Sequence, residues 1–511
     1  MAVVKTPAVQ TEPVKTAEQE RVEALLKEGD ATVKVNVEGA IEKYAQALQL
    51  DSTNVPALWK LSLAYEKKED WERVAAALAR AATIAPGVVA YWHRRGNALV
   101  EQAREGGGEY ETARESLSKC LKLEPKLADC AFLLGEVEEW AEHAQTAAER
   151  YTQAVQLDAG QARYYRALAA LYGLFKQPSE QEGVLVEGMQ RVEPTDRSRP
   201  YLARMSVTLA QLSAARHDLA ASQRWLEQAE THFSIGSPEV AYEIGAIYAA
   251  AYESGAGAAK REAALRMLTM FTKRTCRGAA AAKFKEQCEL SSIMIQVLGS
   301  DAVPRATSPA LPPAIVPPPP GMPSPKLDMQ PQRAGDSYTV WGASYAFRSR
   351  QHRRDVTEKP IAITGYVVKT NLGQAPRCAV HRGGIADPEN CRAEIPAFWL
   401  GDSLDAPETD CIKVMGFASN YAQLFDAIRQ ADSAKPDEPY SDSFWGQTIP
   451  NPLPARGAKL TVRGNYGLTF AKASSGAESD PIMGIMDYRE RDVLEQAPEL
   501  ETLPGVKRRK R

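Results

Sequence analysis

The chain has 511 residues, of which 44% are hydrophobic and 25% are charged, and its formal net charge is −3. This composition supports buried cores and excludes a strongly basic chain that would bind nucleic acid or an anionic membrane surface through its overall charge. We find no apolar run of the roughly 18 to 20 residues that span a bilayer, and the start lacks the apolar core of a secretory signal. We therefore expect a multidomain, cytoplasmic protein, and the seven cysteines predict no disulfide scaffold.

The segment 17–299 repeats a helical pattern at a nearly constant interval. The turns that close five successive units are 34, 39, 34 and 35 residues apart and end at Ser52, Pro86, Pro125, Ala159 and Pro194. The longer interval contains an insertion, Glu105–Glu109. Small residues such as Gly96 and Gly135 would let the first helix of a unit lie close to the second. The pattern predicts an all-α solenoid of helix pairs.

This spacing and these anchors resemble the tetratricopeptide repeat, a helix–turn–helix unit of about 34 residues. The resemblance implies a non-enzymatic scaffold whose protein partner lies in a concave groove along the first helices. The positions that would face this groove are Trp59, Leu63, His93, Asn97, Phe132, Glu136 and Arg166. Each of them can also be an ordinary packing or surface residue. Members that bind chaperone tails use a Lys, Arg and Asn clamp, of which only Asn97 is present, so we do not expect that ligand.

Residues 300–336 form a proline-rich linker between two modules. Prolines at this density sustain neither a helix nor a central strand, so we predict an extended spacer. The run PPAIVPPPPGMP could also be a ligand for an aromatic groove. Residues 1–16 are predicted to be a disordered tail, and residues 500–511 a basic C-terminal tail.

The segment 337–499 carries a different pattern, with β-branched and aromatic residues in short runs. We predict three strands, an amphipathic helix and two more strands, at 359–372, 394–402, 411–418, 420–431, 457–467 and 481–495. This order resembles the five-stranded oligonucleotide/oligosaccharide-binding (OB) barrel, which has a helix between its third and fourth strands. A small α+β domain is the alternative.

The surface of this module could contact a second partner through three aromatic residues and an arginine: Tyr366, Trp399, Arg463 and Tyr466. Residues 337–499 contain 18 Lys and Arg against 21 Asp and Glu, which is not the concentrated positive face that phosphate binding requires. We therefore predict an adaptor that binds one protein through the groove and a second partner through the β module. The alternative is a nucleic-acid-associated protein that uses the β module and the basic tail.

A cysteine-rich segment offers the one chemically suggestive cluster in the sequence. Cys378, His381, Cys391 and Cys411 could supply four ligands to a tetrahedral zinc ion, but the paired C-x2-C spacing of a strong zinc motif is missing. A Cys378–Cys391 disulfide and unlinked cysteines are the alternatives. We see no G-x-S-x-G, phosphate-binding loop or H-E-x-x-H motif, so we predict neither an enzyme nor an obligatory cofactor.

Overall fold

The computed structural model describes residues 16–104, 110–233, 238–253, 258–299, 322–349, 351–383, 390–433, 439–473, 476–480 and 482–507. The predicted N-terminal tail to residue 15, the insertion 105–109, the linker to residue 321 and the tail from residue 508 lie outside them. The chain divides into a helical unit, Met1–Leu327, and a sheet unit, Asp328–Arg511. Within the described ranges, no helix is both long and apolar enough to cross a membrane.

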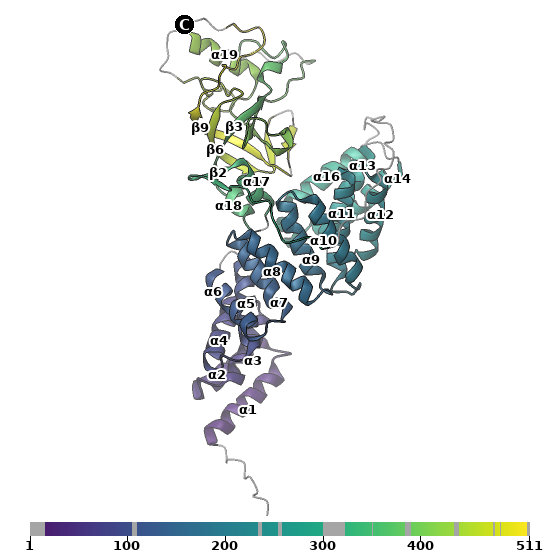
Figure 1. The fold of residues 1–511 in the computed structure, drawn as a ribbon, viewed down its shortest axis with the longest axis vertical. Coiled ribbons are helices and arrows are strands. Elements are labelled where there is room, and N and C mark those ends of the chain that lie inside the picture. Colours follow the sequence, from purple (N-terminus) through teal and green to yellow (C-terminus); the bar gives the residue numbers. More distant parts are fainter. Residues whose placement is uncertain are drawn as a thin grey trace, which may run out of the picture. The chain divides into compact units, whose positions relative to one another are not determined.

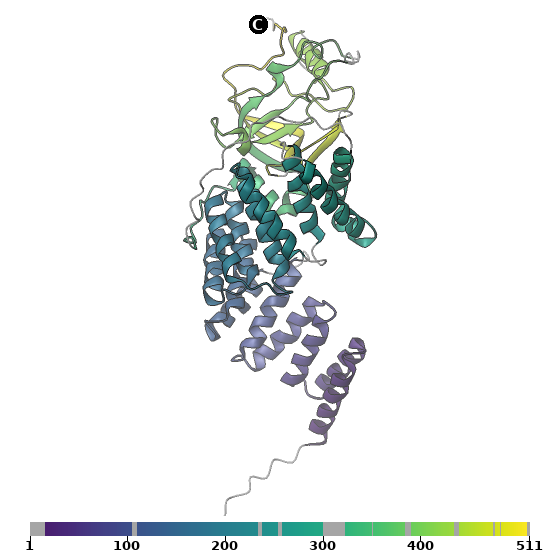
Figure 2. The ribbon, with the colours of Figure 1, turned by 90° about the vertical axis from the view of Figure 1, so that its right-hand side faces the viewer.

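The helical unit is a stack of seven helix pairs, with two further helices after the last pair (Figures 1 and 2). The first four pairs are α1 (Ala17–Thr32) with α2 (Val37–Leu50), α3 (Val55–Glu66) with α4 (Trp71–Ile84), α5 (Val89–Arg104) with α6 (Tyr110–Leu123), and α7 (Ala128–Trp140) with α8 (Ala144–Leu157). The last three are α9 (Ala162–Leu174) with α10 (Pro178–Arg191), α11 (Arg199–Ala215) with α12 (Leu219–His232), and α13 (Pro238–Glu253) with α14 (Ala258–Thr275). Helices α15 (Ala279–Lys283) and α16 (Lys285–Gly299) follow, and α16 packs on α13 and α14.

Short polar turns start and stop these helices. Asn54 and Asp70 are N-caps whose side chains accept a hydrogen bond from the backbone N–H three residues later. Such caps satisfy donors that the first helical turn leaves without a partner. The turn inside several pairs also has one residue in the left-handed region, including Glu69 at φ 57° and Lys176 at φ 55°. The same local turn chemistry therefore recurs along the stack.

The predicted role of the small residues in the first helices is confirmed. A Cβ atom on Gly96 would lie 2.4 Å from Leu117 Cδ2, and one on Gly135 would lie 2.6 Å from Tyr151 Cδ1. Both neighbours are fully buried side chains of the second helix of the same pair. The first helix can approach the second this closely only because its contact position has no side chain.

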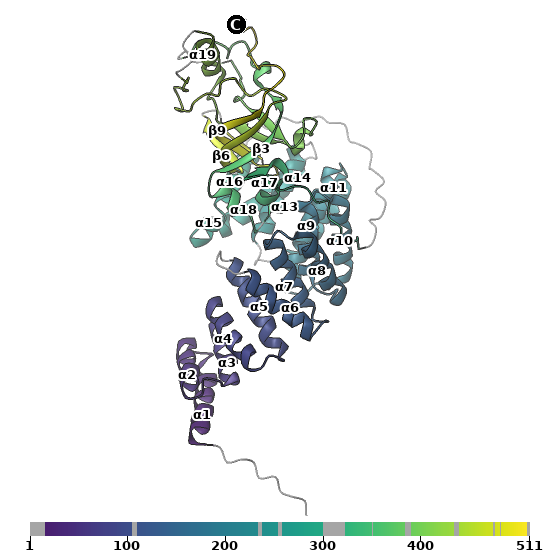
Figure 3. The ribbon, with the colours of Figure 1, turned by 60° about the vertical axis from the view of Figure 1, so that its left-hand side comes forward.

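The sheet unit contains nine described strands and three α-helices (Figure 3). Each predicted strand segment contains a strand: β3 (Ile361–Thr370), β4 (Phe398–Gly401), β5 (Ile412–Met415), β6 (Lys459–Gly467) and β9 (Ile485–Glu495). The predicted helix is α19 (Tyr421–Asp432). Six further elements were not predicted: β1 (Arg333–Ala334), β2 (Ser337–Thr339), α17 (Val340–Arg348), α18 (Arg353–Thr357), β7 (Thr469–Ala473) and β8 (Gly476–Ser479).

Five of these strands pair in a continuous ring. Strand β3 pairs with β4, β4 with β5, β5 with β9, β9 with β6, and β6 returns to β3. Only the β5–β9 pairing in this ring is parallel. Inside it lies a core whose largest residues include Phe398, Phe417 and Tyr488. Phe417 is fully buried, and its ring centre lies 5.5 Å from that of Phe398.

Candidate partner-binding surfaces

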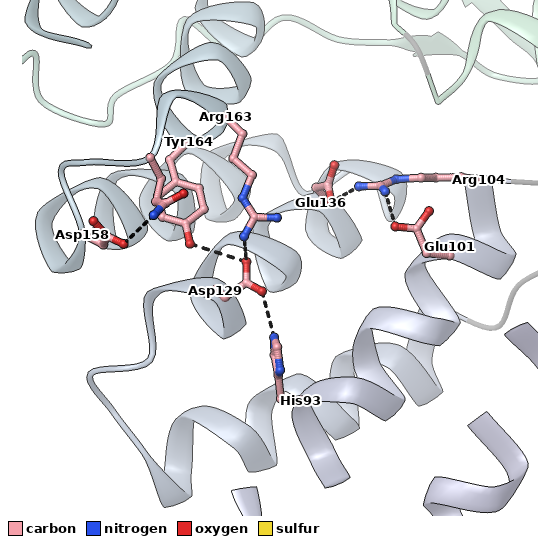
Figure 4. A network of polar contacts seen from close by, with 9 residues as sticks. His93, Glu101, Arg104, Asp129, Glu136, Asp158, Arg163 and Tyr164 are labelled. Atoms are coloured by element: carbon pink, nitrogen blue, oxygen red, sulfur yellow. Dashed lines mark hydrogen bonds and ion pairs between the residues drawn. The ribbon is translucent and has the colours of Figure 1, made fainter. Parts of the chain in front are cut away.

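The first helices of the third to fifth pairs are joined by a polar network (Figure 4). His93 Nε2 of α5 lies 2.8 Å from Asp129 Oδ2 of α7, and Arg163 of α9 donates to Asp129 Oδ1. Tyr164 Oη is 3.4 Å from the same oxygen. The side chains of His93, Asp129 and Arg163 are 26%, 23% and 36% exposed, so the network is accessible from the surface. We call these three residues and Tyr164 the Asp129 network.

Electrostatics keep the Asp129 carboxylate charged. Its burial by itself would raise the pKa, but the hydrogen bond with His93 and the charge of Arg163 outweigh that effect, so the pKa lies below its ordinary value. A second pairing connects α5 and α7, because Arg104 Nη2 of α5 donates to Glu136 Oε2 of α7 at 2.5 Å. Salt bridges thus connect first helices one repeat apart.

The structure places the predicted groove residues in two environments. Phe132 and Glu136 are buried, at 5% and 2% exposed, which limits their direct contact with any partner. The other five are partly exposed: Trp59, Leu63, His93, Asn97 and Arg166. Phe132 lies beneath the Asp129 network, with the Arg163 guanidinium 5.0 Å from its ring centre. Only His93 of the predicted set belongs to the network itself.

A pocket of about 730 Å³ opens next to this network, at the ends of α8 and α10 and the starts of α9 and α11. Three arginines line it, Arg163, Arg191 and Arg197, together with Glu193 and Tyr201. The predicted groove residue Arg166 lies beside it, with its guanidinium 5.6 Å from the Tyr201 ring centre. Asp129 and these arginines were not predicted from the sequence. A usable signal was present, since His93, Asp129 and Arg163 are 36 and 34 residues apart, which is about one repeat.

A second pocket, of about 560 Å³, lies within the sheet unit on β2, β3 and β6. Lys459 and Arg463 line it, and hydroxyl groups of Ser337, Thr364 and Thr461 form a chain across it. The Ser337–Thr364 oxygen distance is 2.6 Å, and the Thr364–Thr461 distance is 2.7 Å. The pocket therefore presents polar groups and two cationic side chains.

Of the four surface residues predicted for this module, Arg463 lines that pocket. Tyr366 is near it, because Lys459 Nζ of the pocket lies 4.9 Å from the Tyr366 ring centre. Trp399 lies on β4 beneath two lysines and is only 9% exposed. The expectation that Tyr466 is a surface residue is wrong: it is 2% exposed, and its hydroxyl donates to the Met483 carbonyl. Every second side chain of β6 faces the core in this stretch, and Tyr466 is one of them.

Six of the seven cysteines are paired, contrary to the expectation of no disulfide scaffold. The disulfides are Cys120–Cys130, Cys276–Cys288 and Cys378–Cys391. The two cysteines of each disulfide are 10 to 13 residues apart, so each disulfide links segments that are close in the sequence. Cys120, in the last turn of α6, is joined to Cys130 in α7. Composition does not reveal such pairs, because the total number of cysteines is ordinary.

The Cys378–Cys391 disulfide is one of the alternatives considered for the cysteine-rich segment. A zinc site needs sulfur ligands as thiolates, so this pairing and the four-ligand site exclude each other. Cys411 is buried and its sulfur lies 3.3 Å from the Pro407 carbonyl oxygen, while His381 Nδ1 lies 2.9 Å from the Arg382 carbonyl oxygen. Within the described ranges, no three His, Cys, Asp or Glu residues are arranged to hold a metal ion.

No family model and no curated protein matches the chain. Similar solved structures include MamA from Desulfovibrio magneticus RS-1, at 16% identity over 34% of this chain and 96% of that chain, with a TM-score of 0.32. TTC0263, a TPR protein from Thermus thermophilus, is 17% identical over 37% of this chain and 98% of that chain, with a TM-score of 0.29. PilF from Pseudomonas aeruginosa is 17% identical over 44% of this chain and 98% of that chain, with a TM-score of 0.34. The helix pairs and their period define the helical unit as a tetratricopeptide-like array.

Proposed function

We propose that the chain is a non-enzymatic adaptor whose helical unit binds an acidic, extended segment of a protein partner. The observation that carries this proposal is the pocket lined by Arg163, Arg191 and Arg197 beside the partly exposed Asp129 network. Arginine suits this role because its planar guanidinium binds carboxylates in a bidentate manner. A partner carboxylate near Arg163 would share it with Asp129, so binding would add to the network without dismantling it.

Charge reversal at the pocket tests this proposal. In the full chain, Arg163→Glu and Arg197→Glu together are expected to weaken capture of an acidic partner segment by about 100-fold, since close charge pairs are worth a few kcal/mol. The matched control is Arg224→Glu, an exposed arginine on α12, which should change capture little. A photo-reactive residue at position 97 or 166 should crosslink to the same partner. If the double variant captured the acidic segment as well as the Arg224→Glu control does, this site would be contradicted.

We further propose that the five-strand ring of the sheet unit is an OB-like barrel that contacts a second partner. Its pairing order is the support, because a helix lies between the third and fourth ring strands and the third and fifth pair in parallel. A cysteine pair at positions 364 and 461 tests the closure. These residues are register partners on β3 and β6, so they should crosslink readily on oxidation. Cysteines at 363 and 461, one residue out of register, are the control.

The pocket on β2, β3 and β6 is the proposed contact surface for that second partner, which we infer to be a protein. Its cations have acidic neighbours, since Arg463 Nη1 lies 2.6 Å from Asp492 Oδ2 and Lys459 Nζ lies 3.6 Å from Glu495 Oε1. Nucleic acid would need a surface with excess positive charge. Retention on single-stranded DNA at low salt, lost in Lys459→Glu, would instead favour the nucleic-acid alternative.

We propose that the chain matures in an oxidising compartment, in place of the cytoplasmic location expected from the sequence. The support is the pairing of six cysteines in three disulfides, since such bonds are rare in reducing compartments. Thiol titration of the denatured protein, isolated without reductant, should then detect one thiol, that of Cys411. Detection of seven thiols would restore the cytoplasmic location and reopen the zinc alternative.

A further inference from the structure

A short segment of the chain lies against the ends of three helices of the array. It is Ser324–Leu327, with the sequence SPKL, and it belongs to the helical unit. Tyr172 Oη, in the last turn of α9, donates to the Ser324 carbonyl oxygen at 2.8 Å. Gln177 Nε2, at the N-cap of α10, donates to the Lys326 carbonyl oxygen at 3.1 Å. Two residues of one helix hairpin thus hold the main chain of a segment about 150 residues further along.

Gln145, in the first turn of α8, makes a two-sided contact with the same segment. Its side-chain amide donates to the Pro325 carbonyl oxygen at 2.5 Å and accepts from the Leu327 N–H at 3.0 Å. The segment also turns on itself, because the Lys326 N–H donates to the Ser324 carbonyl oxygen at 2.7 Å, which makes a tight turn centred on Pro325. The Gln145 amide braces this turn by contacting both the Pro325 carbonyl and the Leu327 N–H. Three carbonyls in succession and one N–H are satisfied by three array side chains.

The side chains of the segment differ in how far they are buried. The Leu327 side chain is only 4% exposed, while the side chains of Ser324 and Lys326 are exposed. Tyr172 is fully buried with the segment in place, and burial raises the pKa of its hydroxyl to about 12. Its hydroxyl is therefore protonated and available as a donor at neutral pH. The contact selects a main chain that turns at its second residue and carries a leucine at its fourth. Proline suits the second position because no N–H is used there.

We propose that the common end of α8, α9 and α10 is a peptide-binding site, occupied by Ser324–Leu327 as an intramolecular ligand. A partner segment that makes the same turn and has a leucine at the fourth position would compete for it. This site is distinct from the arginine pocket, since Arg163 and Tyr172 are nine residues apart on α9, about 14 Å along the helix. Neither site requires the other.

The intramolecular ligand has an advantage in concentration. A segment tethered to the same chain binds at an effective concentration on the order of millimolar, so a weak site is filled without an external ligand. Competition by a partner would release residues 322–327 from the helix ends, so partner binding and release of this segment would be coupled.

Trypsin provides a direct test, because the Lys326–Leu327 bond is the one whose carbonyl and N–H are both held. Cleavage of this bond in the full native chain should track the fraction of time that the segment is released. Tyr172→Phe keeps the buried ring and removes one hydrogen bond, so it should accelerate cleavage about fivefold. Gln145→Ala with Gln177→Ala removes three and should accelerate it about thirtyfold or more. Gln211→Ala, an exposed glutamine on α11, is the matched control.

Thermal unfolding of each variant establishes that the array itself stays folded. Equal cleavage of this bond in the wild type and in both Tyr172→Phe and the double variant would overturn the intramolecular site. The second measurement adds a synthetic peptide of residues 322–328 with glutamine for Lys326, which trypsin does not cut. At millimolar concentration it should accelerate cleavage of the chain's own bond severalfold, whereas a peptide with the leucine moved to its first position should not. No acceleration by either peptide would overturn binding in trans.

Discussion

The two units differ in how far along the chain their contacts reach. In the helical unit, ion pairs join residues about one repeat apart, such as Glu66 with Arg94 and Asp129 with Arg163. In the sheet unit, Thr364 and Thr461 are neighbours although 97 residues separate them. A stack of repeats is stabilised by nearest-neighbour interfaces, so damage to it stays local. A ring of strands closes only when its first and last members meet, so we expect it to fail as a whole.

The largest expected effect is therefore in the ring. Phe417→Ala removes a fully buried side chain whose ring lies 5.5 Å from Phe398 and 6.1 Å from Tyr488. We expect a loss of about 3–5 kcal/mol in the free energy of unfolding of the sheet unit. Hydrogen exchange should rise together in all five ring strands and stay unchanged in α1–α10. Faster exchange confined to β5 would break the proposed contrast between the units.

The disulfide between α6 and α7 tests the helical side of the contrast. Replacing Cys120 and Cys130, both fully buried, by alanine should lower local stability by about 2–3 kcal/mol, since a crosslink limits the unfolded chain. Because repeats are coupled mainly to their neighbours, amide exchange should rise in α5–α8 and remain low in α13 and α14. The matched control is Cys378→Ala with Cys391→Ala, which should leave the array unaffected. Loss of all helical protection in a single transition would contradict local coupling.

The same difference in contact range determines how much of each unit could be predicted. The repeats could be predicted because each turn, cap and glycine contact is local. The roles of Gly96 and Gly135 followed from spacing alone. Strand segments such as 457–467 could also be predicted, from their alternation. Which strands pair with them could not, because the register depends on partners about 100 residues away. Tyr466 was misplaced for this reason, since alternation alone does not say which face is buried.

The candidate sites show a similar division. His93 was identified as a groove residue from its repeat position, but its partner Asp129 lies on another helix and became visible only in the structure. The contact of Ser324–Leu327 with the array was even harder to predict from the sequence. The segment has no pattern of its own, and its partners Gln145, Tyr172 and Gln177 are brought together by the turns of the array. Side-chain contacts to a main chain leave little trace in the sequence of that main chain.

The Asp129 network gives a smaller, pH-dependent test. Asp129→Asn keeps the shape but removes the charge that faces His93, Arg163 and Tyr164, and should cost about 1–2 kcal/mol at pH 7. The folded-state pKa of Asp129 is below its ordinary value of about 3.9. The wild type therefore holds this advantage above that value and loses it as the pH falls through the folded-state pKa. Denaturant unfolding at pH 7 and near pH 3 measures both points. A difference between the proteins that does not shrink at pH 3 would contradict a charge effect.

The smallest expected effect concerns the turns, where the two units again differ. The turn between α3 and α4 puts exposed Glu69 in the left-handed region at φ 57°, whereas the sheet unit uses glycine at comparable positions, such as Gly484 at φ 73°. Glycine adopts this conformation without steric cost, but it also gives the unfolded chain more freedom. These terms oppose each other, so Glu69→Gly should change stability by less than about 1 kcal/mol. Gly484→Ala should cost more, because its Cβ would lie 2.7 Å from the buried Tyr466 ring. Equal losses in the two variants would show that Glu69 makes a stabilising contact that offsets its strained backbone, and that this turn is more than a spacer between two helices.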